Sequence, residues 1–174
     1  MKLLRTLIFL FMMFILLAVI VGAILPRKIH VEQTKTINAP AATVFNQVNN
    51  VENWENWSYW KLNDPGMAIS YPGQKVGKGA TYTWKSESSG NGSMEIVESN
   101  PNSSIKTALK FDQGGGNGTW KFEPDENGTK VTWSFDTDMG SNPIMSIKGF
   151  IMKRILNTSL EESLENMKGV LEGK

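Results

Sequence analysis

The sequence contains no cysteine and only one histidine among its 174 residues. Without cysteine the chain can form no disulfide, thiolate nucleophile, iron–sulfur cluster or zinc ribbon. The single histidine, His30, cannot supply a multi-histidine metal site, and it follows closely on a long apolar segment. A Ser-His-Asp triad also needs a histidine inside an active site. We therefore assign no residue a catalytic or metal-binding role.

The sequence also lacks a strong excess of charge of either sign. Lysine and arginine number 18 against 17 acidic residues, which gives a formal net charge of +1. Lys2 and Arg5 precede the apolar segment, so the remainder is close to neutral and offers no basic surface for nucleic acid. The glycine-rich stretch 73–80 lacks the spacing, the hydroxyl residue and the following helix of a phosphate-binding loop. The sequence therefore implies no cofactor and no nucleic-acid partner.

What the sequence does contain is a run of nineteen residues, Leu7 to Leu25, without a polar side chain. As a helix this run would be about 28 Å long, close to the thickness of a membrane's hydrocarbon core. A cleaved signal peptide is the alternative, since Val21-Gly22-Ala23 resembles a cleavage site after a basic start. The run exceeds the usual length of a signal peptide's apolar region, so we favour a retained single-pass anchor over residues 1–26. The side of the membrane stays undetermined, because basic residues flank the run at both ends.

Residues 27–174 are long enough for one domain that needs no cross-link to hold it together. Residues 31–38 are rich in threonine and β-branched side chains, which predicts a first strand. Pro40 and the helical spacing of the apolar residues that follow predict a short helix over residues 41–49. A second short helical or turn-rich segment, residues 51–60, carries three tryptophans with a spacing of three, which places their indoles on one side.

From residue 67 the apolar period changes from helical to alternating. Six further strands are predicted over residues 67–71, 80–87, 93–98, 104–111, 118–123 and 129–138. Asn91-Gly92, Asn117-Gly118 and Asn127-Gly128 are predicted to be tight hairpin turns, since both residue types tolerate the positive φ of a type I′ turn. Such short connections require an antiparallel sheet, because parallel neighbours need long crossovers.

The last predicted element is a long helix over residues 143–171. Pro143 suits a first helical turn, and Ser141 or Asn142 before it can cap the free amide groups. Apolar residues recur three to five positions apart on one stripe, and they must be buried against the strands. The stripe consists of Ile144, Ile147, Ile151, Ile155, Leu160, Leu164, Met167 and Leu171.

These elements predict an α+β fold, with a curved seven-stranded antiparallel sheet around the long C-terminal helix and two short helices after the first strand. A strongly twisted sheet curls, and one helix on its concave side does not fill the space completely. We therefore expect an apolar cavity between helix and sheet, with a solid core as the alternative. The residues expected to line the cavity are Trp57, Trp60, Tyr82, Trp84, Ile96, Leu109, Phe111, Trp120, Phe122, Trp133, Ile147, Phe150 and Ile151, with the first two near its mouth.

Several short motifs carry a resemblance to a known family. They are Thr36-Ile37-Asn38-Ala39-Pro40, Val44-Phe45, Trp54 with Trp57, Tyr71-Pro72-Gly73, the segment Gly77 to Trp84, Ile96-Val97-Glu98 with Pro101, and Gly128 to Trp133. In these motifs the chain resembles the polyketide cyclase/dehydrase family of the START and birch-pollen-allergen-like (SRPBCC) superfamily. The resemblance implies a helix-grip fold, in which the sheet wraps the terminal helix around an apolar cavity. It brings no catalytic residues, because family members differ widely in activity and many only bind lipids or other hydrophobic molecules.

The leading hypothesis is a helix-grip ligand-binding domain, residues 27–174, that holds a hydrophobic small molecule or lipid. The anchor, residues 7–25, would keep this domain at the membrane, where such molecules concentrate. The sequence favours binding over catalysis, since it contains no recognisable catalytic constellation. It leaves the identity of the ligand and the oligomeric state open.

Two alternatives come from other functional classes. An enzyme of the cyclase or dehydrase type would act on an apolar carbonyl compound and would need an ionisable group inside the cavity. Glu98 is the most inward carboxylate because it is in phase with Met94 and Ile96, although a structural hydrogen bond near the Pro101 turn is its favoured role. A protein-interaction domain resembling co-chaperone relatives of the fold would instead use an exposed outer face.

Overall fold

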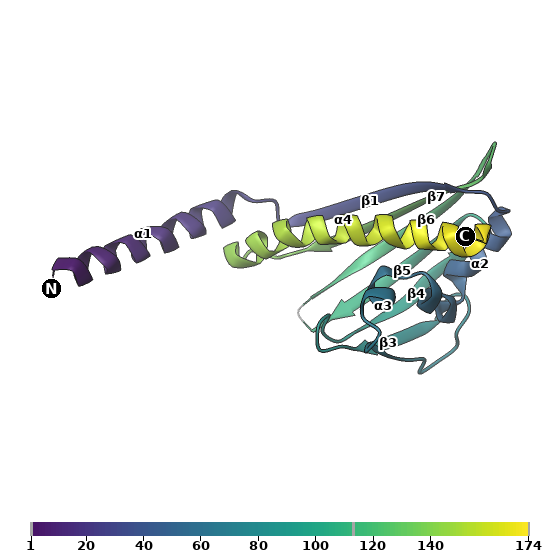
Figure 1. Cartoon of the computed structure of the whole chain (residues 1–174), viewed down its shortest axis with the longest axis horizontal. Coiled ribbons are helices and arrows are strands. Elements are labelled where there is room, and N and C mark those ends of the chain that lie inside the picture. The colour runs from purple at the N-terminus through teal and green to yellow at the C-terminus, as the bar shows by residue number, and fades with distance from the viewer. Residues whose placement is uncertain (1, 113, 174) are drawn as a thin grey trace.

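The computed structural model of this chain describes residues 2–112 and 114–173. Helix α1 (Lys2–Ile24) projects from a body that contains a seven-stranded sheet and the other helices (Figure 1). The helices of the body are α2 (Ala41–Asn49), the 3₁₀ helix η1 (Val51–Asn56), α3 (Tyr59–Asn63) and α4 (Pro143–Glu172). The strands are β1 (Lys28–Ile37), β2 (Ala68–Ser70), β3 (Thr81–Lys85), β4 (Gly92–Asn100), β5 (Ser104–Phe111), β6 (Gly114–Asp125) and β7 (Gly128–Asp138).

The sheet has the order β1-β7-β6-β5-β4-β3-β2, and every neighbouring pair is antiparallel. Strands β2 to β7 therefore follow one another as a meander, and β1 joins the sheet beyond β7. The long helix α4 runs along β1 and across the sheet (Figure 1). The predicted α+β fold class and its helix-grip arrangement are confirmed.

Two of the predicted hairpin turns are wrong. Asn117-Gly118 lies inside β6, where Gly118 pairs with Thr107 of β5 and Phe135 of β7, and Gly92 pairs with Trp84 as the first residue of β4. Both glycines make room for a neighbouring side chain instead of turning the backbone. A Cβ at Gly118 would lie 2.4 Å from Thr107 Oγ1, and one at Gly92 would lie 2.2 Å from Trp84 Cζ2.

The third predicted turn lies one residue earlier than expected. Glu126 and Asn127 form the turn between β6 and β7, and Gly128 opens β7 with a φ of 126°. The positive φ therefore falls on the glycine alone, and the asparagine before it keeps an ordinary backbone conformation.

A cluster of tryptophans forms the centre of the core. Trp120 and Trp133 are directly opposite each other on β6 and β7, and their rings stack with centroids 4.0 Å apart and planes 18° apart. Trp54 and Trp57 of the η1 segment meet both rings edge to face. All four tryptophans are buried, so the η1 segment is fixed against the concave face of the sheet by aromatic packing.

Helix α4 begins at Pro143, as predicted, and ends at Glu172, one residue beyond the predicted range. The Asn142 side chain accepts a hydrogen bond from the Ile144 N–H, and Gly173 closes the helix with a φ of 73°. In its second half Leu160, Leu164 and Met167 are buried against the body. Full burial of the predicted stripe is nevertheless wrong in the first half, because Ile144, Ile151 and Ile155 are exposed there and Ile147 is only half-buried. Small residues, Ser146 and Gly149, take the side that packs on the body.

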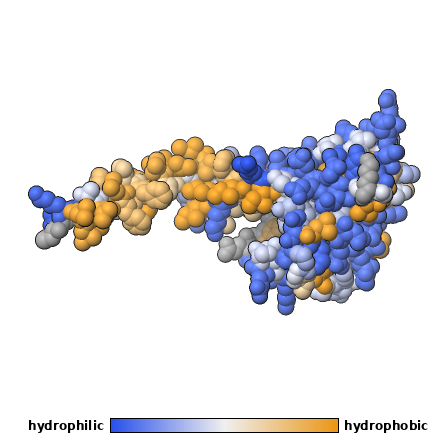
Figure 2. All heavy atoms as spheres, in the orientation of Figure 1, coloured by the Kyte–Doolittle hydropathy of each residue, from blue (hydrophilic) through white to orange (hydrophobic). Residues whose placement is uncertain are grey.

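Helix α1 contacts the body only near its C-terminal end. Gly22 is its one buried residue, and a Cβ there would lie 2.3 Å from the Pro143 carbonyl oxygen at the start of α4. Ala18, one turn earlier, is half-buried, and the other apolar side chains of α1 are exposed (Figure 2). The helix is long and apolar enough to cross a membrane, a property that N-terminal signal sequences share.

Candidate ligand-binding cavity

A cavity of about 680 Å³ lies between the concave face of the sheet, the η1–α3 segment and the middle of α4. Most of its wall is apolar. The sheet contributes Ile69, Tyr82, Trp84, Thr107, Leu109, Phe111, Trp133 and Phe135, and α4 contributes Met152, Ile155, Leu156 and Leu160. The η1–α3 segment, the residues that follow it and the loop after β3 contribute Val51, Trp54, Ser58, Tyr59, Trp60, Lys61, Asn63, Asp64, Met67, Tyr71, Ser88 and Ser89.

The structure brings together six of the predicted lining residues and places seven elsewhere. On the cavity wall lie Trp60, Tyr82, Trp84, Leu109, Phe111 and Trp133. In the core behind the wall lie Trp57, Ile96, Trp120 and Phe122. On the outward or flanking side of α4 lie Ile147, Phe150 and Ile151. Contact between the six wall residues and a bound molecule remains a prediction.

Two features of the structure explain the displacement of Phe122 and of the three α4 residues. Helix α2 fills one end of the groove, where its Phe45 ring meets Phe122 edge to face at 5.6 Å, so no open space is left there. On α4 the small residues Ser146 and Gly149 face the body, which turns the bulky side chains at neighbouring positions away from it. The cavity therefore occupies only the half of the groove beneath α3.

Sequence reasoning missed several wall residues. Phe135 is in phase with Trp133 on β7, so the alternation of that strand could have identified it. Met152, Leu156 and Leu160 recur every four residues and form a second apolar stripe on α4 that the isoleucines obscured. No sequence signal indicated that Trp54 would reach the wall and Trp57 would not.

One buried polar group in the cavity wall, the Thr107 hydroxyl, has no hydrogen-bond partner among the described residues. Thr107 is 1% exposed, and its hydroxyl forms no hydrogen bond with any residue that the structure describes. Gly118 lies beside it, and a Cβ at this glycine would also lie 3.6 Å from Nε1 of Trp133. Because Gly118 has no side chain, the Thr107 hydroxyl and the Trp133 indole N–H both lie next to the space that a Cβ would occupy. This is a suitable environment for one oxygen atom of a bound molecule.

The charged groups of the cavity lie at its rim and are occupied by local interactions. Asp64 accepts hydrogen bonds from Ser86 and Ser88, which hold the pKa of its carboxyl below the ordinary value. Lys61 Nζ donates to the carbonyl oxygens of Met67, at 2.8 Å, and Pro65, at 3.3 Å. Asp64 therefore stays ionised at neutral pH, which makes it a poor proton donor.

Glu98 points away from the cavity, contrary to its predicted phase. A β-bulge between Ile96 and Glu98 shifts the register of β4 against β5, so Glu98 is opposite Lys106 on the outer face. Its carboxylate accepts hydrogen bonds from Lys106, at 2.8 Å, and from Asn100, at 2.8 Å. Both interactions hold the pKa of Glu98 below its ordinary value. Its role is structural, as the favoured sequence interpretation had it.

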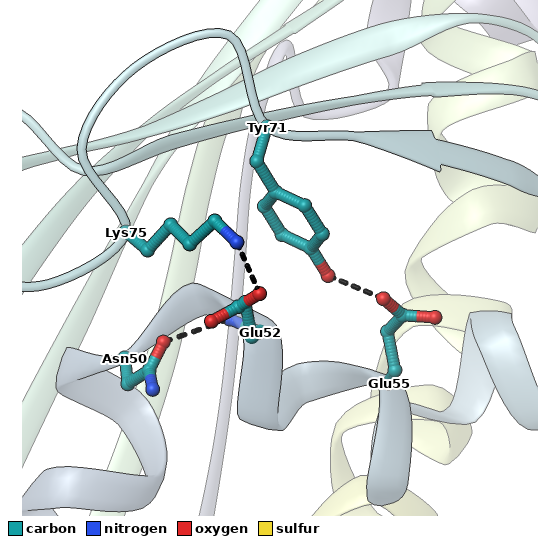
Figure 3. A network of polar contacts seen from close by, with 5 residues as sticks. All are labelled: Asn50, Glu52, Glu55, Tyr71 and Lys75. Atoms are coloured by element: carbon teal, nitrogen blue, oxygen red, sulfur yellow. Dashed lines mark hydrogen bonds and ion pairs between the residues drawn. The ribbon is translucent and has the colours of Figure 1, made fainter.

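A polar network fixes one side of the cavity wall (Figure 3). The Tyr71 hydroxyl donates to Glu55 Oε1 at 2.5 Å, and Lys75 Nζ lies 2.5 Å from Glu52 Oε1. The Asn50 side chain caps η1 by accepting a hydrogen bond from the Glu52 N–H at 3.1 Å. Because Tyr71 lines the cavity, this network ties the wall to η1.

Burial raises the pKa of two phenols in the wall, Tyr71 and Tyr82, above the ordinary value of tyrosine, and the Glu55 carboxylate adds to the shift at Tyr71. In the folded protein both phenols therefore keep their protons at a pH where those of the unfolded chain, with a pKa of about 10, lose theirs. Stability is unaffected well below about pH 10 and falls as the pH rises above it.

We expect the free energy of unfolding to fall between about pH 9 and pH 11, and to fall less in Tyr82→Phe, which removes one of the two phenols. Urea unfolding of the full chain in a non-ionic detergent, repeated across this range, measures the difference. Identical pH profiles for the two proteins would contradict the assignment. Tyr82 is the suitable position because no described residue forms a hydrogen bond with its hydroxyl, so the substitution breaks no other contact.

Comparisons with known proteins agree with this geometry. The model of the family described as "Polyketide cyclase / dehydrase and lipid transport" matches residues 28–172. Protein MLL2253 from Mesorhizobium loti has a similar structure, with 11% identity, a TM-score of 0.64 and coverage of 83% of this chain and 98% of that one. The Aha1 dimer from Colwellia psychrerythraea gives 16% identity, a TM-score of 0.59 and coverage of 83% and 96%. At these identities the likeness shows the fold alone. The chain has no significant match among curated proteins.

Proposed function

Because the chain belongs to the polyketide cyclase / dehydrase and lipid transport family, we propose that it binds a hydrophobic small molecule or lipid in the cavity between the sheet and α4. The observation that carries the proposal is the cavity itself. Its volume of about 680 Å³ lies within the usual range of small-molecule sites, and its wall is mostly apolar. A bound apolar molecule would exclude water from the apolar surface of this wall, and burial of apolar surface is the main source of affinity in such sites.

The wall also indicates one feature of the guest. The Thr107 hydroxyl is buried without a partner, and an unsatisfied buried polar group costs about 1–3 kcal/mol. A guest with a carbonyl or hydroxyl oxygen near Thr107 would recover that cost. We therefore propose an apolar molecule with one polar group, whose oxygen atom lies near Thr107.

Membrane attachment through α1 is the second part of the proposal. Only three residues separate α1 from β1, so a membrane-spanning α1 would hold the cavity close to the bilayer, where apolar molecules concentrate. Extraction of the mature chain with sodium carbonate, together with its N-terminal sequence, tests this part. A protein that starts after residue 23 and is released from the membrane would support a cleaved signal sequence instead.

The cavity supports binding better than it supports the two alternatives. Its carboxylate, Asp64, is ionised and hydrogen-bonded at the rim, and its inner phenol, Tyr82, has a raised pKa, so neither group is suited to proton transfer near neutral pH. A protein-interaction domain that uses the outer face of the sheet would need an apolar patch there. Among the described strand residues of that face, Val97 is the large apolar side chain that is exposed.

The test of the proposal is the binding of a dansyl-labelled fatty acid to the full chain in lipid nanodiscs. Four tryptophans line the cavity, so a guest inside it should receive energy from their fluorescence. We expect saturable energy transfer at one probe per chain. Empty nanodiscs correct for partitioning of the probe into lipid, and no saturable signal above that background would contradict the proposal.

The variant Leu109→Glu places an acidic group in the cavity wall and is expected to weaken probe binding by at least about tenfold, because a buried carboxylate repels the carboxylate of the probe and is not compensated by its acyl chain. The matched control is Val97→Glu, which adds the same charge on the outer face of the sheet, where Val97 is 38% exposed. Its affinity should stay within about twofold of the wild type. Equal weakening by both substitutions would mean that the probe does not occupy the cavity.

A further inference from the structure

The first half of α4 is apolar on two opposite faces. The face toward the body consists of Ser146, Gly149, Met152 and Leu156, which are buried or half-buried. The opposite face carries Ile144, Ile147, Ile151 and Ile155, here called the isoleucine stripe. Its members follow each other at intervals of three, four and four residues and therefore lie along one side of the helix. Ile144 is 61%, Ile151 60% and Ile155 55% exposed.

A stripe of this kind is unusual on a surface that faces water. A helix that is apolar on all sides is normally buried in protein or in lipid, and large exposed apolar patches mark interaction sites. Phe150, which is 65% exposed, widens the stripe. Figure 2 shows a continuous apolar surface from α1 onto the part of α4 that extends beyond the sheet.

The two ends of the stripe connect two features already described. At its start, Pro143 packs on Gly22 in the last turn of α1, so Ile144 lies beside the end of the long apolar run. At its far end, Ile155 belongs to the cavity wall. With a rise of about 1.5 Å per residue, the stripe covers the distance of about 16 Å between these points.

The charges around the stripe are complementary to a lipid surface. Residues 143–160 contain Lys148, Lys153 and Arg154 and no acidic residue. All three are exposed, and none of them forms an ion pair with a described residue. Arg27 and Lys28 add two positive charges next to α1.

Two acidic groups of β7, the strand that precedes α4, form local interactions. Asp136 Oδ1 lies 2.8 Å from His30 Nδ1, and Asp138 accepts a hydrogen bond from the Gly140 N–H. A basic helix with an apolar face is typical of segments that lie in the headgroup region of a bilayer. Lys148 and Arg154, three residues before and three residues after Ile151, therefore flank the stripe on its two sides and could pair with anionic lipid headgroups.

We propose that the isoleucine stripe contacts the bilayer beside α1 and forms the path along which a lipid passes between the bilayer and the cavity. The occupant is lipid, because the stripe continues the apolar surface of α1 and is flanked by cations. The inference rests on the proposed function and on α1 spanning the membrane. It adds the route of entry and the surface that the body turns toward the bilayer.

The absence of cysteine allows a direct test of bilayer contact. A single cysteine at Ile151→Cys, labelled with the fluorophore NBD, is compared with one at Lys153→Cys in full chain reconstituted in vesicles of phosphatidylcholine with phosphatidylglycerol. The two positions lie at nearly the same level along the helix axis but on opposite sides of the helix, so bilayer contact on the stripe side would expose only the label at 151 to lipid. We expect lipids that carry a doxyl quencher to quench the label at 151 at least about threefold more strongly than the label at 153.

Transfer of the dansyl fatty acid from vesicles into the cavity tests the path. Ile151→Glu should slow transfer at least about fivefold without changing the equilibrium affinity, because the residue lies outside the cavity wall. Val97→Glu, which adds the same charge on the outer face of the sheet, should transfer like the wild type. Equal rates for Ile151→Glu and the wild type would overturn the path.

The remaining outcomes are also decisive. Equal quenching at 151 and 153 overturns bilayer contact, and so does self-quenching between labels at 151 without quenching by lipid, which would show that a second copy covers the stripe. Strong quenching at 151 in a protein that binds no probe would overturn the cavity function and the path, while bilayer contact stands. Failure of the inference is thus distinguishable from failure of the proposed function.

Discussion

Replacement of Trp120 with alanine is expected to lower the free energy of unfolding by about 3–5 kcal/mol, the usual loss when a fully buried tryptophan is truncated. The Trp120 side chain is 0% exposed. It stacks on Trp133 at 4.0 Å and meets Trp54 and Trp57 edge to face at 5.7 Å and 5.9 Å. Its removal leaves a void that rigid aromatic neighbours cannot close, so the loss includes packing as well as transfer of apolar surface.

Urea unfolding of the full chain in a non-ionic detergent, followed by circular dichroism, measures this loss. Trp120→Phe should lose clearly less than Trp120→Ala, because it keeps most of the ring and removes an indole N–H that has no hydrogen-bond partner among the described residues. Val97→Ala, on the outer face, should stay within about 0.5 kcal/mol of the wild type. A loss below about 1.5 kcal/mol for Trp120→Ala would show that the cluster rearranges and that the wall behind the cavity is not rigid.

Gly128→Ala is expected to destabilise the fold by about 3 kcal/mol or more, for two independent reasons. The φ of Gly128 is 126°, a conformation that residues with a side chain rarely adopt. A Cβ there would also lie 2.3 Å from the Ile37 carbonyl oxygen and 2.8 Å from Asn38 Cα. Both are backbone atoms, one in the last residue of β1 and the other in the connection that follows it, so they cannot move aside as the end of a side chain could.

Substitutions at two other glycines distinguish the cost of the positive φ from the cost of the close backbone contact. Gly77 has a φ of 76° but open space around its Cβ position, so Gly77→Ala should cost only the conformational strain, about 1–2 kcal/mol. Gly73 has neither a positive φ nor a close neighbour, and Gly73→Ala should stay within about 0.5 kcal/mol of the wild type. The same urea series measures all three variants. Equal losses at Gly77 and Gly128 would mean that the backbone contact is unimportant.

The general architecture could be predicted because it depends on local patterns. Alternation of apolar and polar residues identified the strands, and the short connections between them required antiparallel pairing, which the sheet order confirms. Pro143 and Asn142 fixed the start of α4 to the residue. These signals act over a few residues and do not need knowledge of the partners.

The details of the cavity could not be predicted, because they depend on which elements meet. The same glycine that can turn a hairpin also makes room for a neighbouring side chain, as Gly118 does for Thr107. The β-bulge in β4 turns the Glu98 side chain from the inner to the outer face of the sheet, and no pattern in the sequence predicts that bulge. Helix α4 has two apolar stripes, and only the position of Ser146 and Gly149 against the body decides which one faces inward.

The two edges of the open sheet also limit how copies of this protein can associate. The edge at β2 is only three residues long, and the edge at β1 carries the charged or polar side chains of Lys28, Glu32 and Lys35 along its ten residues. Short edge strands and edge charges both oppose the addition of a further strand. Crowding of many copies should therefore not produce continuous intermolecular sheets or fibrils.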